Sequence, residues 1–227
     1  MYELYIGNKA YSSWSLRPWV LMKARNIEFT EHLVQFGGSS NYDAFRIFSP
    51  SGRVPCLVNA GDTVWDSLAI AEYLAERHNW VWPNDAKARA WARCAAAEMH
   101  SGFAALRETA SMCCGVKIKL TQRSAAFERD LARINELWTE GVTRFGGPFL
   151  AGPEFTAVDA FFCPVAFRVQ SYALELSAPA AKVAAALLEL PPMKQWYAEA
   201  LAETFRDAGH EADLSKFGTV LEDLRAR

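Results

Sequence analysis

The chain contains 227 residues, of which 51% are hydrophobic and 22% are charged, and its formal net charge is −2. This length suits one large or two small globular domains, and the lack of a basic run argues against a nucleic-acid partner. Since no apolar run is long enough for a membrane span and the start does not resemble a signal peptide, we expect a cytoplasmic protein without a membrane partner.

The first 78 residues alternate between strand-like and helix-like segments. In chain order we expect a strand at 3–6, a helix at 14–25, a strand at 28–34, a short helix at 42–48, a hairpin with strands at 55–58 and 63–65, and a helix from residue 67. This β-α-β-α-β-β-α order predicts a thioredoxin-like domain over residues 1–78, in the α+β class.

Residues 79–85, with the sequence NWVWPND, are rich in turn formers and are the best candidate for a linker. Beyond them, apolar residues recur at helical spacing, which predicts an all-α helical domain over residues 86–227. The last twenty or so residues, from Asp207 on, show no clear pattern.

Thr156 and Asp159 have the spacing of a capping box, with an aspartate at the third helical position. They predict where a helix through Phe161 and Val165 begins. We interpret both residues as structural, so that replacing Asp159 should lower stability without changing any chemistry.

Two features near residue 60 suggest a binding site. Val54 and Pro55 stand at the start of a short apolar run, where a proline cannot donate to a sheet and therefore indicates an edge or turn. Asp66 and Ser67 lie where a helix is expected to begin, and a helix N-terminus offers free N–H groups and a positive dipole end. Such a terminus is suited to binding a carboxylate.

Together these features resemble the glutathione-binding half of the cytosolic glutathione S-transferases, in which a cis Val-Pro precedes a strand and an acidic residue plus serine precedes the next helix. The matching residues are Pro50, Val54, Pro55, Asp66, Ser67, Ile70, Tyr73 and Leu74. In the helical part, residues 149–152 followed by Thr156 and Asp159 resemble the sequence motif that the family carries in its helical domain. The resemblance covers essentially the whole chain and implies a detoxification enzyme that uses glutathione as cosubstrate, without a metal, usually as a homodimer.

Residues 11–18, with the sequence YSSWSLRP, supply the catalytic candidates. Proline is tolerated only near the start of a helix, so Pro18 predicts that helical bonding begins no earlier than about Ser15. Ser12 and Ser13 would then lie in the preceding loop. A hydroxyl that donates a hydrogen bond near a helix N-terminus favours the ionised form of a thiol.

This segment resembles the serine-type, zeta-like bacterial branch of the family, whose pattern is Ser-Ser-Cys-x-x-Arg. In that alignment Ser12 takes the catalytic position, Ser13 the neighbouring one, and Arg17 keeps the arginine. Trp14 replaces the cysteine, which counts against maleylacetoacetate isomerisation. Tyr11 remains an alternative contact for the thiol, and the serines remain open to a plainer interpretation as loop and cap residues.

The resemblance also assigns the remaining contacts of glutathione. Ser67 would bind the γ-glutamyl carboxylate, Asp66 the ammonium, and the backbone of Val54, before Pro55, the cysteinyl amide. Arg53 would reach the glycyl carboxylate. An equally good interpretation is that Arg53 is only a solvated charge on the surface. Asn41 or Ser40 could also touch the glycyl end.

The pocket for the second substrate is expected between the first loop and the first long helix of the helical domain. Its candidates are Trp14, Phe103, Leu106 and Arg107. The function implied is conjugation of the glutathione thiolate to a small apolar electrophile. Alternatives are a glutathione-dependent isomerase or dehalogenase on the same site, or a non-catalytic interaction protein on a transferase scaffold.

The cysteines and histidines support neither a redox nor a metal site. Five cysteines are scattered without a CxxC pair, and the four histidines show no HxH or HxxxH spacing. These patterns argue against a disulfide framework, a zinc site and a glutaredoxin-like reductase.

Overall fold

The computed structural model describes residues 1–37 and 41–226, so Ser40 lies outside the described residues. Its N-terminal part contains a four-stranded sheet in the order β2-β1-β3-β4. The strands are β1 (Tyr2–Ile6), β2 (Phe29–Leu33), β3 (Cys56–Asn59) and β4 (Asp62–Trp65). β1 pairs parallel with β2 and antiparallel with β3, and β3 pairs antiparallel with β4.

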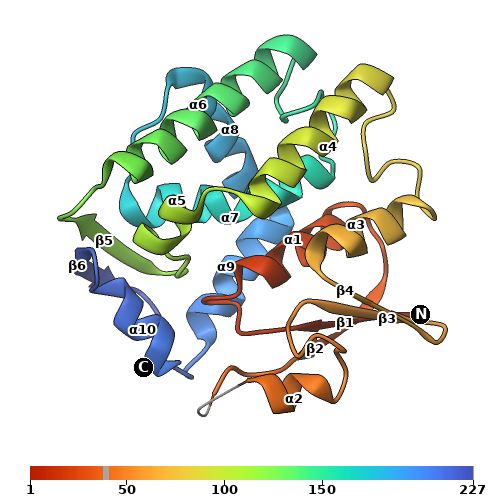
Figure 1. Cartoon of the computed structure of the whole chain (residues 1–227), viewed down its shortest axis with the longest axis horizontal. Helices are drawn as coiled ribbons and strands as arrows, with labels where there is room; N and C mark the ends of the chain where they lie inside the picture. The colour runs from red at the N-terminus through yellow and green to blue at the C-terminus, as the bar shows by residue number, and fades with distance from the viewer. Residues whose placement is uncertain (38–40, 227) are drawn as a thin grey trace.

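Three helices complete this part of the chain, and they follow the predicted order. They are α1 (Ser13–Ala24), α2 (Tyr42–Arg46) and α3 (Ser67–Ala75). In Figure 1, α1 and α3 lie between the sheet and the remaining helices, whereas α2 lies on the other side of the sheet. The predicted α+β, thioredoxin-like fold is confirmed, and the Val54–Pro55 peptide bond is cis.

α1 begins earlier than the sequence predicts. Pro18 indicated a start no earlier than Ser15, but the helix begins at Ser13 and contains Pro18 as its sixth residue. That prediction was wrong because a proline removes only one hydrogen bond near the first turn, and the packing of α1 outweighs that loss. Ser13 is therefore helical, and Ser12 is the N-cap residue rather than a loop residue.

The second part of the chain is mainly helical, as predicted. Its helices are α4 (Ala86–Ser101), α5 (Ala104–Thr109), α6 (Ala125–Phe145), α7 (Ala157–Tyr172), α8 (Ala178–Glu189), α9 (Pro191–Ala202) and α10 (Ala208–Leu214). α7 is buried along nearly its whole length and packs against α1, α4 and α8. No helix in the described ranges is long and apolar enough to cross a membrane.

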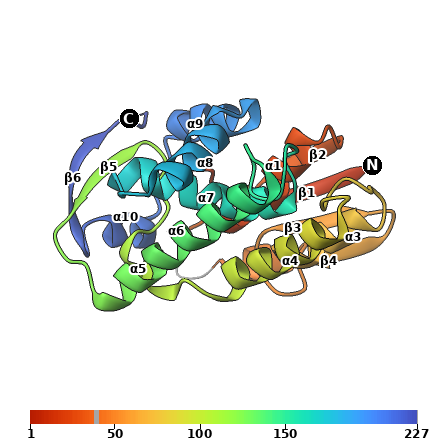
Figure 2. The ribbon, with the colours of Figure 1, turned by 90° about the horizontal axis from the view of Figure 1, so that it is seen from above.

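The structure adds two strands that were not predicted, β5 (Val116–Leu120) and β6 (Gly218–Asp223), which pair antiparallel. β5 does carry a two-residue period, because Val116 and Ile118 are buried between lysines. β6 is almost entirely exposed and so has no such period. Figures 1 and 2 show that this ribbon and α10 bring the C-terminal segment back beside α5 and α7.

The loop before α1 is fastened to α9. Lys9 is buried and its ammonium contacts both Glu31 and Glu199. Glu203 accepts from the backbone N–H of Lys9 at 2.7 Å, and the Trp196 indole N–H donates to the Lys9 carbonyl at 2.9 Å. The position of the two serines relative to the helical part is therefore set by ion pairs and hydrogen bonds on both sides.

Candidate functional site

Two neighbouring cavities lie where α1, the β3 start and the helical part meet. The serine cavity has a volume of about 430 Å³ and contains Ser12 and Ser13 in its wall. The Asp66 cavity has a volume of about 390 Å³, and its wall includes Arg53, Val54, Pro55, Asp66 and Ser67. Trp14, Arg53 and Val54 line both cavities, so a ligand with an extended chain can occupy the two together.

Ser12 and Ser13 differ in how their hydroxyl groups are used. The Ser12 hydroxyl donates to Ser15 Oγ at 2.7 Å, and Ser15 Oγ also accepts from the Gly7 N–H at 3.2 Å. The Ser13 hydroxyl makes no hydrogen bond to any residue that the structure describes, although Ser13 is 8% exposed. Ser13 therefore offers a free donor, whereas Ser12 must turn its proton away from Ser15 to donate to a ligand.

Tyr11 lines the serine cavity, but its hydroxyl bonds the C-terminal segment. It donates to Glu211 Oε1 at 2.5 Å, and the Arg225 guanidinium reaches both groups. Burial raises the pKa of Tyr11 well above its usual range, and the bond to Glu211 acts in the same direction. The Tyr11 proton is thus engaged away from any thiol bound in the cavity.

Asp66 combines a cap with a free carboxylate oxygen. Its φ is +77°, and Oδ1 accepts from the N–H groups of Leu68 at 2.7 Å and Ala69 at 3.5 Å. Oδ2 faces His100 Nε2 at 3.5 Å. Because burial lowers the pKa of His100, the imidazole is neutral near pH 7, and the charge of Asp66 is left for a ligand cation.

Ser67, the first residue of α3, is 1% exposed. Its Oγ accepts a hydrogen bond from Arg17 Nη1 at 3.2 Å. The Arg17 guanidinium carbon lies 4.1 Å from the centroid of the Trp14 ring, and that of Arg107 lies 4.8 Å from it. The wall between the two cavities is therefore an indole ring held by two cations.

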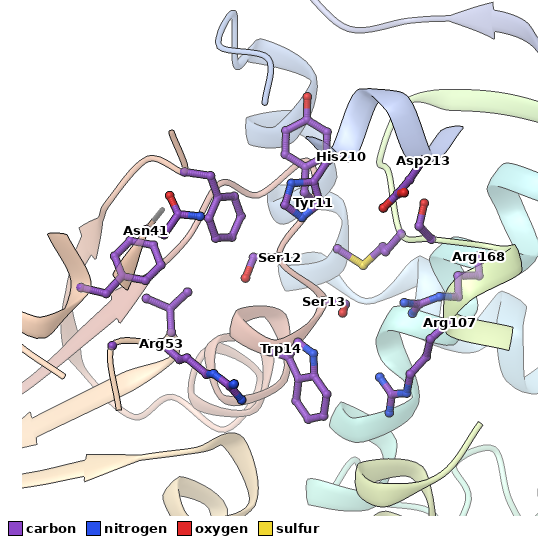
Figure 3. A pocket seen from close by; sticks show the side chains of 16 residues that line it. Tyr11, Ser12, Ser13, Trp14, Asn41, Arg53, Arg107, Arg168, His210 and Asp213 are labelled. Carbon is purple, nitrogen blue, oxygen red and sulfur yellow. The ribbon is translucent and has the colours of Figure 1, made fainter. Parts of the chain in front are cut away.

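The other side of the serine cavity is polar as well as apolar. Figure 3 shows the Arg107 and Arg168 side chains extending toward the cavity, opposite Asn41 and Arg53. Arg168 is 3% exposed, and its Nε and Nη1 donate to backbone carbonyls of Ala110 and Pro164. Burial, and then the neighbouring Arg107, lower the pKa of Arg168 to about 10.

In the described part of the chain, no group of three His, Cys, Asp or Glu side chains is placed to hold a metal ion. The chemistry of these cavities is instead that of hydroxyls, guanidinium groups and one free carboxylate oxygen. Such a set can bind a zwitterionic peptide and donate a hydrogen bond to an anion.

Sequence comparison identifies the family of this site. The sequence model described as "Glutathione S-transferase, N-terminal domain" matches residues 11–77, the segment that supplies all seven predicted site residues. Residues 11–77 are therefore similar to the N-terminal domain of the glutathione S-transferases.

Curated relatives are similar to this chain over longer or separate stretches. A probable maleylacetoacetate isomerase of Caenorhabditis elegans is 26% identical over 77% of this chain and 81% of its own length. The maleylacetoacetate isomerase of Dictyostelium discoideum is 33% identical over 40% of this chain and 42% of its own. The dichloromethane dehalogenase of Methylophilus leisingeri is 40% identical over 26% of this chain and 22% of its own.

Solved structures share the fold. A glutathione transferase homologue from Burkholderia with bound glutathione superposes with a TM-score of 0.64 at 20% identity, covering 88% of this chain and 97% of its own. A diazinon-metabolizing transferase of the silkworm Bombyx mori gives a TM-score of 0.70 at 17% identity, covering 88% of this chain and 97% of its own.

The site predicted from the sequence differs from the structure mainly in the pocket for the second substrate. Trp14 and Arg107 line the serine cavity, but Phe103 and Leu106 do not and belong to the core. The sequence reasoning missed wall residues that come from distant segments: Phe36, Phe45, Ser111, Met112, Arg168, His210 and Asp213. Only Arg168 gave a signal, as the single basic residue in a mainly apolar helical stretch.

Proposed function

We propose that this transferase binds glutathione across the two cavities and transfers its thiolate to a small electrophile in the serine cavity. The observation that carries the proposal is that all seven residues predicted from the sequence line these two adjoining cavities. We further propose that residues 1–78 form the glutathione-binding domain, with 79–85 as linker and 86–227 as the helical domain, and that the enzyme works in the cytoplasm.

The Asp66 cavity suits the γ-glutamyl end of glutathione. Asp66 Oδ2 pairs with the ammonium, while Ser67 donates to the carboxylate at the positive end of α3. The backbone of Val54 pairs with the cysteinyl amide as an added strand would, and Arg53, which forms no ion pair within the described residues, reaches the glycyl carboxylate. The thiol is then directed past Trp14 toward the serines.

Catalysis in the proposal is thiolate stabilisation together with proximity. A serine hydroxyl donates to the sulfur and so lowers the pKa of the glutathione thiol from its ordinary value of about 8.5. The thiolate attacks the electrophile, forms the carbon–sulfur bond and expels the leaving group. The serine keeps its own proton throughout.

The proposed electrophile has an apolar body. Phe36, Phe45 and Met112 give the serine cavity its apolar wall, and the Arg107 and Arg168 side accepts a polar group of the substrate. The isomerase and dehalogenase relatives support a second candidate, a glutathione-dependent isomerisation or dehalogenation on the same thiolate. Product analysis with matched substrates separates these reactions.

A homodimer is part of the proposal. A largely apolar groove of about 610 Å³ lies between β4 and α3, and Trp65 in its wall is 46% exposed. An exposed apolar groove beside Asp66 supports a protein contact there. Light scattering of the purified protein tests the expected mass of two chains.

The test of function is a titration of bound glutathione, in which thiolate absorbance is followed against pH. The wild-type complex should ionise at least one pH unit below free glutathione, and Ser12→Ala or Ser13→Ala should return the pKa toward its free value. Ser101→Ala, at an exposed position of α4, is the matched control. If glutathione does not bind, or if neither cavity substitution changes the titration, the interaction-protein alternative replaces the transferase proposal.

A further inference from the structure

His210 lines the serine cavity and pairs with Asp207, and the mechanism proposed above uses neither residue. His210 Nδ1 lies 2.7 Å from Asp207 Oδ1, and the same oxygen accepts from the His210 backbone N–H at 3.0 Å. Burial alone would raise the pKa of Asp207, but the hydrogen bonds from His210 hold that pKa below its usual range. The imidazole is therefore joined to an ionised carboxylate near pH 7.

Asp207 fixes which nitrogen of His210 carries the proton. An ionised carboxylate can only accept hydrogen bonds, so Nδ1 carries the proton and Nε2 keeps a free lone pair. Nε2 makes no hydrogen bond with any residue that the structure describes. An imidazole with one nitrogen held by a carboxylate and the other nitrogen unpaired in a cavity wall is suited to taking up a proton.

The imidazole ring lies beside the candidate catalytic serines. It stacks on Tyr11, at a centroid distance of 4.8 Å, and on Phe36, at 5.0 Å. Tyr11 directly precedes Ser12, and its hydroxyl donates to Glu211, the residue after His210. Figure 3 shows the imidazole next to Tyr11 and above Ser12, at the edge of the cavity. The first loop thus contacts α10 at two successive residues, which places a base close to the serine hydroxyls.

The serine cavity offers few other groups that could take up a thiol proton. Serine hydroxyls are not bases, the Tyr11 hydroxyl already donates to Glu211, and the arginine side chains are cations. Asp213 is the other titratable acceptor in the described wall, but an exposed aspartate ordinarily binds a proton only at acidic pH. His210 is therefore the strongest base that the described residues of this wall provide near neutral pH.

We infer that His210 is the catalytic base of this site and that Asp207 is its positioning residue, a role that rests on the proposed binding of glutathione. The sulfur–hydrogen bond of the thiol breaks, sulfur keeps the electron pair, and the proton forms a bond to His210 Nε2. The products of this step are a thiolate and an imidazolium, whose opposite charges stabilise each other. After the carbon–sulfur bond has formed, the imidazolium releases the proton to the leaving group or to water, which restores the base.

The charged and titratable groups around His210 act on this ion pair in both directions. They are Asp207, Glu211 and Asp213 on or next to α10, Tyr11 in the first loop, Arg225 after β6, and Arg53, Arg107 and Arg168 in the cavity wall. The acids favour the imidazolium, whereas the guanidinium groups oppose it. The guanidinium groups in the cavity wall also favour the thiolate, so the surroundings stabilise the pair of charges more than the imidazolium alone.

The test counts the protons that leave the protein when glutathione binds at pH 7. Calorimetry in buffers of different ionisation enthalpy gives the number of protons released, and thiolate absorbance gives the number of thiolates formed. S-methylglutathione, which has no thiol proton, reports the protons released by other groups, and that number is subtracted. The variants are His210→Phe, which keeps an aromatic ring beside Tyr11 and Phe36, and Asp207→Asn, which keeps a helix cap.

His32→Phe is the matched control. His32 also stacks on a tyrosine, Tyr5, at a centroid distance of 4.5 Å, and its Nε2 lies 3.1 Å from a carboxylate oxygen of Glu3. It lies on β2 and does not line the serine cavity. An effect that appears in His210→Phe but not in His32→Phe therefore belongs to the cavity rather than to stacked histidines in general.

The wild type should release less than about half a proton per thiolate, because His210 keeps the proton, whereas His210→Phe should release about one. His210→Phe should also lower kcat/KM about ten- to hundredfold at pH 7. This loss should shrink above about pH 8.5, where the thiol ionises without a base. Asp207→Asn should fall between the wild type and His210→Phe, and His32→Phe should match the wild type.

Release of one proton per thiolate by the wild type overturns the role of His210, because the proton has then gone to solvent. A loss of kcat/KM in His210→Phe that is equal at every pH also overturns it, since a lost packing contact alone would give that result. If His210→Phe does not fold, the proton count of the wild type decides.

Failure of the proposed function gives a different result. A wild-type protein that does not bind glutathione, or binds it without forming a thiolate, contradicts the proposed function, and the role of His210 fails with it. A wild-type protein that forms the thiolate but releases its proton keeps the proposed function and loses only the role of His210.

Discussion

The starts of α3 and α7 place the same chemical group in two different settings. At α7, Asp159 is fully buried, and its oxygens accept from the N–H of Leu150 at 2.8 Å and the N–H of Thr156 at 2.9 Å. At α3, the side chain of Asp66 is 42% exposed and caps with one oxygen, while its other oxygen lies 3.5 Å from His100 Nε2 and remains accessible to a ligand cation. A cap whose acceptors are all used is structural, whereas a cap with a spare, accessible oxygen can also bind a ligand.

The largest effect is expected at the buried cap. Asp159→Ala should lower the free energy of unfolding by about 3 kcal/mol, because two buried N–H groups lose their acceptor. Urea denaturation measures this loss, and glutathione affinity measured at a temperature where the variant is folded should be unchanged. Lost activity with an unchanged melting temperature would contradict the structural role of Asp159.

The same residue should make stability depend on pH. Burial raises the pKa of Asp159 to about 7, against about 3.9 in an unfolded chain, although the hydrogen bonds from Leu150 and Thr156 oppose the shift. Between these values the folded state holds a proton that the unfolded state has lost. Stability from this group should therefore fall as pH rises from about 4 to 7, by at most about 1.4 kcal/mol per pH unit. Asp159→Asn should remove this slope from the unfolding curves.

The accessible cap should respond in the opposite way. Asp66→Asn should leave the free energy of unfolding within about 0.5 kcal/mol of the wild type, since asparagine caps helices as well as aspartate does and tolerates a positive φ. Glutathione affinity should fall about tenfold because the ammonium loses its counter-charge. Calorimetry gives the glutathione affinity and urea denaturation gives the free energy of unfolding, both on one preparation of the variant. If Asp66→Asn lowers stability but not affinity, Asp66 is a structural cap like Asp159, which contradicts this prediction.

The smallest effect is expected at the edge of the buried cap. Thr156→Val removes the hydroxyl that lies 3.3 Å from Asp159 Oδ2 and should cost about 1 kcal/mol of stability. Affinity for glutathione should be unchanged. Thr156→Ser keeps the hydroxyl and serves as the control, with an unfolding midpoint close to that of the wild type.

The sequence predicted the parts of the fold and site whose signals are local. The helix start at Asp66 and Ser67 and the box at Thr156 and Asp159 each depend on residues no more than three positions apart, and all four occupy the expected helix starts. The order of strands and helices in the first 78 residues was predictable for the same reason, because hydrophobic period and turn residues act within short windows.

The remaining features arise from tertiary contacts. The bond from Ser12 to Ser15 and the start of α1 depend on packing that overrides the local effect of Pro18. Arg168 enters the serine cavity from α7 and His210 from α10, and no short window of sequence places either beside the first loop. β6 could not be predicted because its exposed residues carry no alternating pattern.

The contact between Tyr11 and Glu211 also bears on when the enzyme becomes active. These residues are 200 positions apart, and Arg225, whose side chain is 2% exposed, completes the contact. Chains fold as they emerge during synthesis, N-terminal segments first. Ser12 and Ser13 are therefore made well before α10, which adds a wall to their cavity. A nascent chain consequently carries its serines in an incomplete site until α10 has been made.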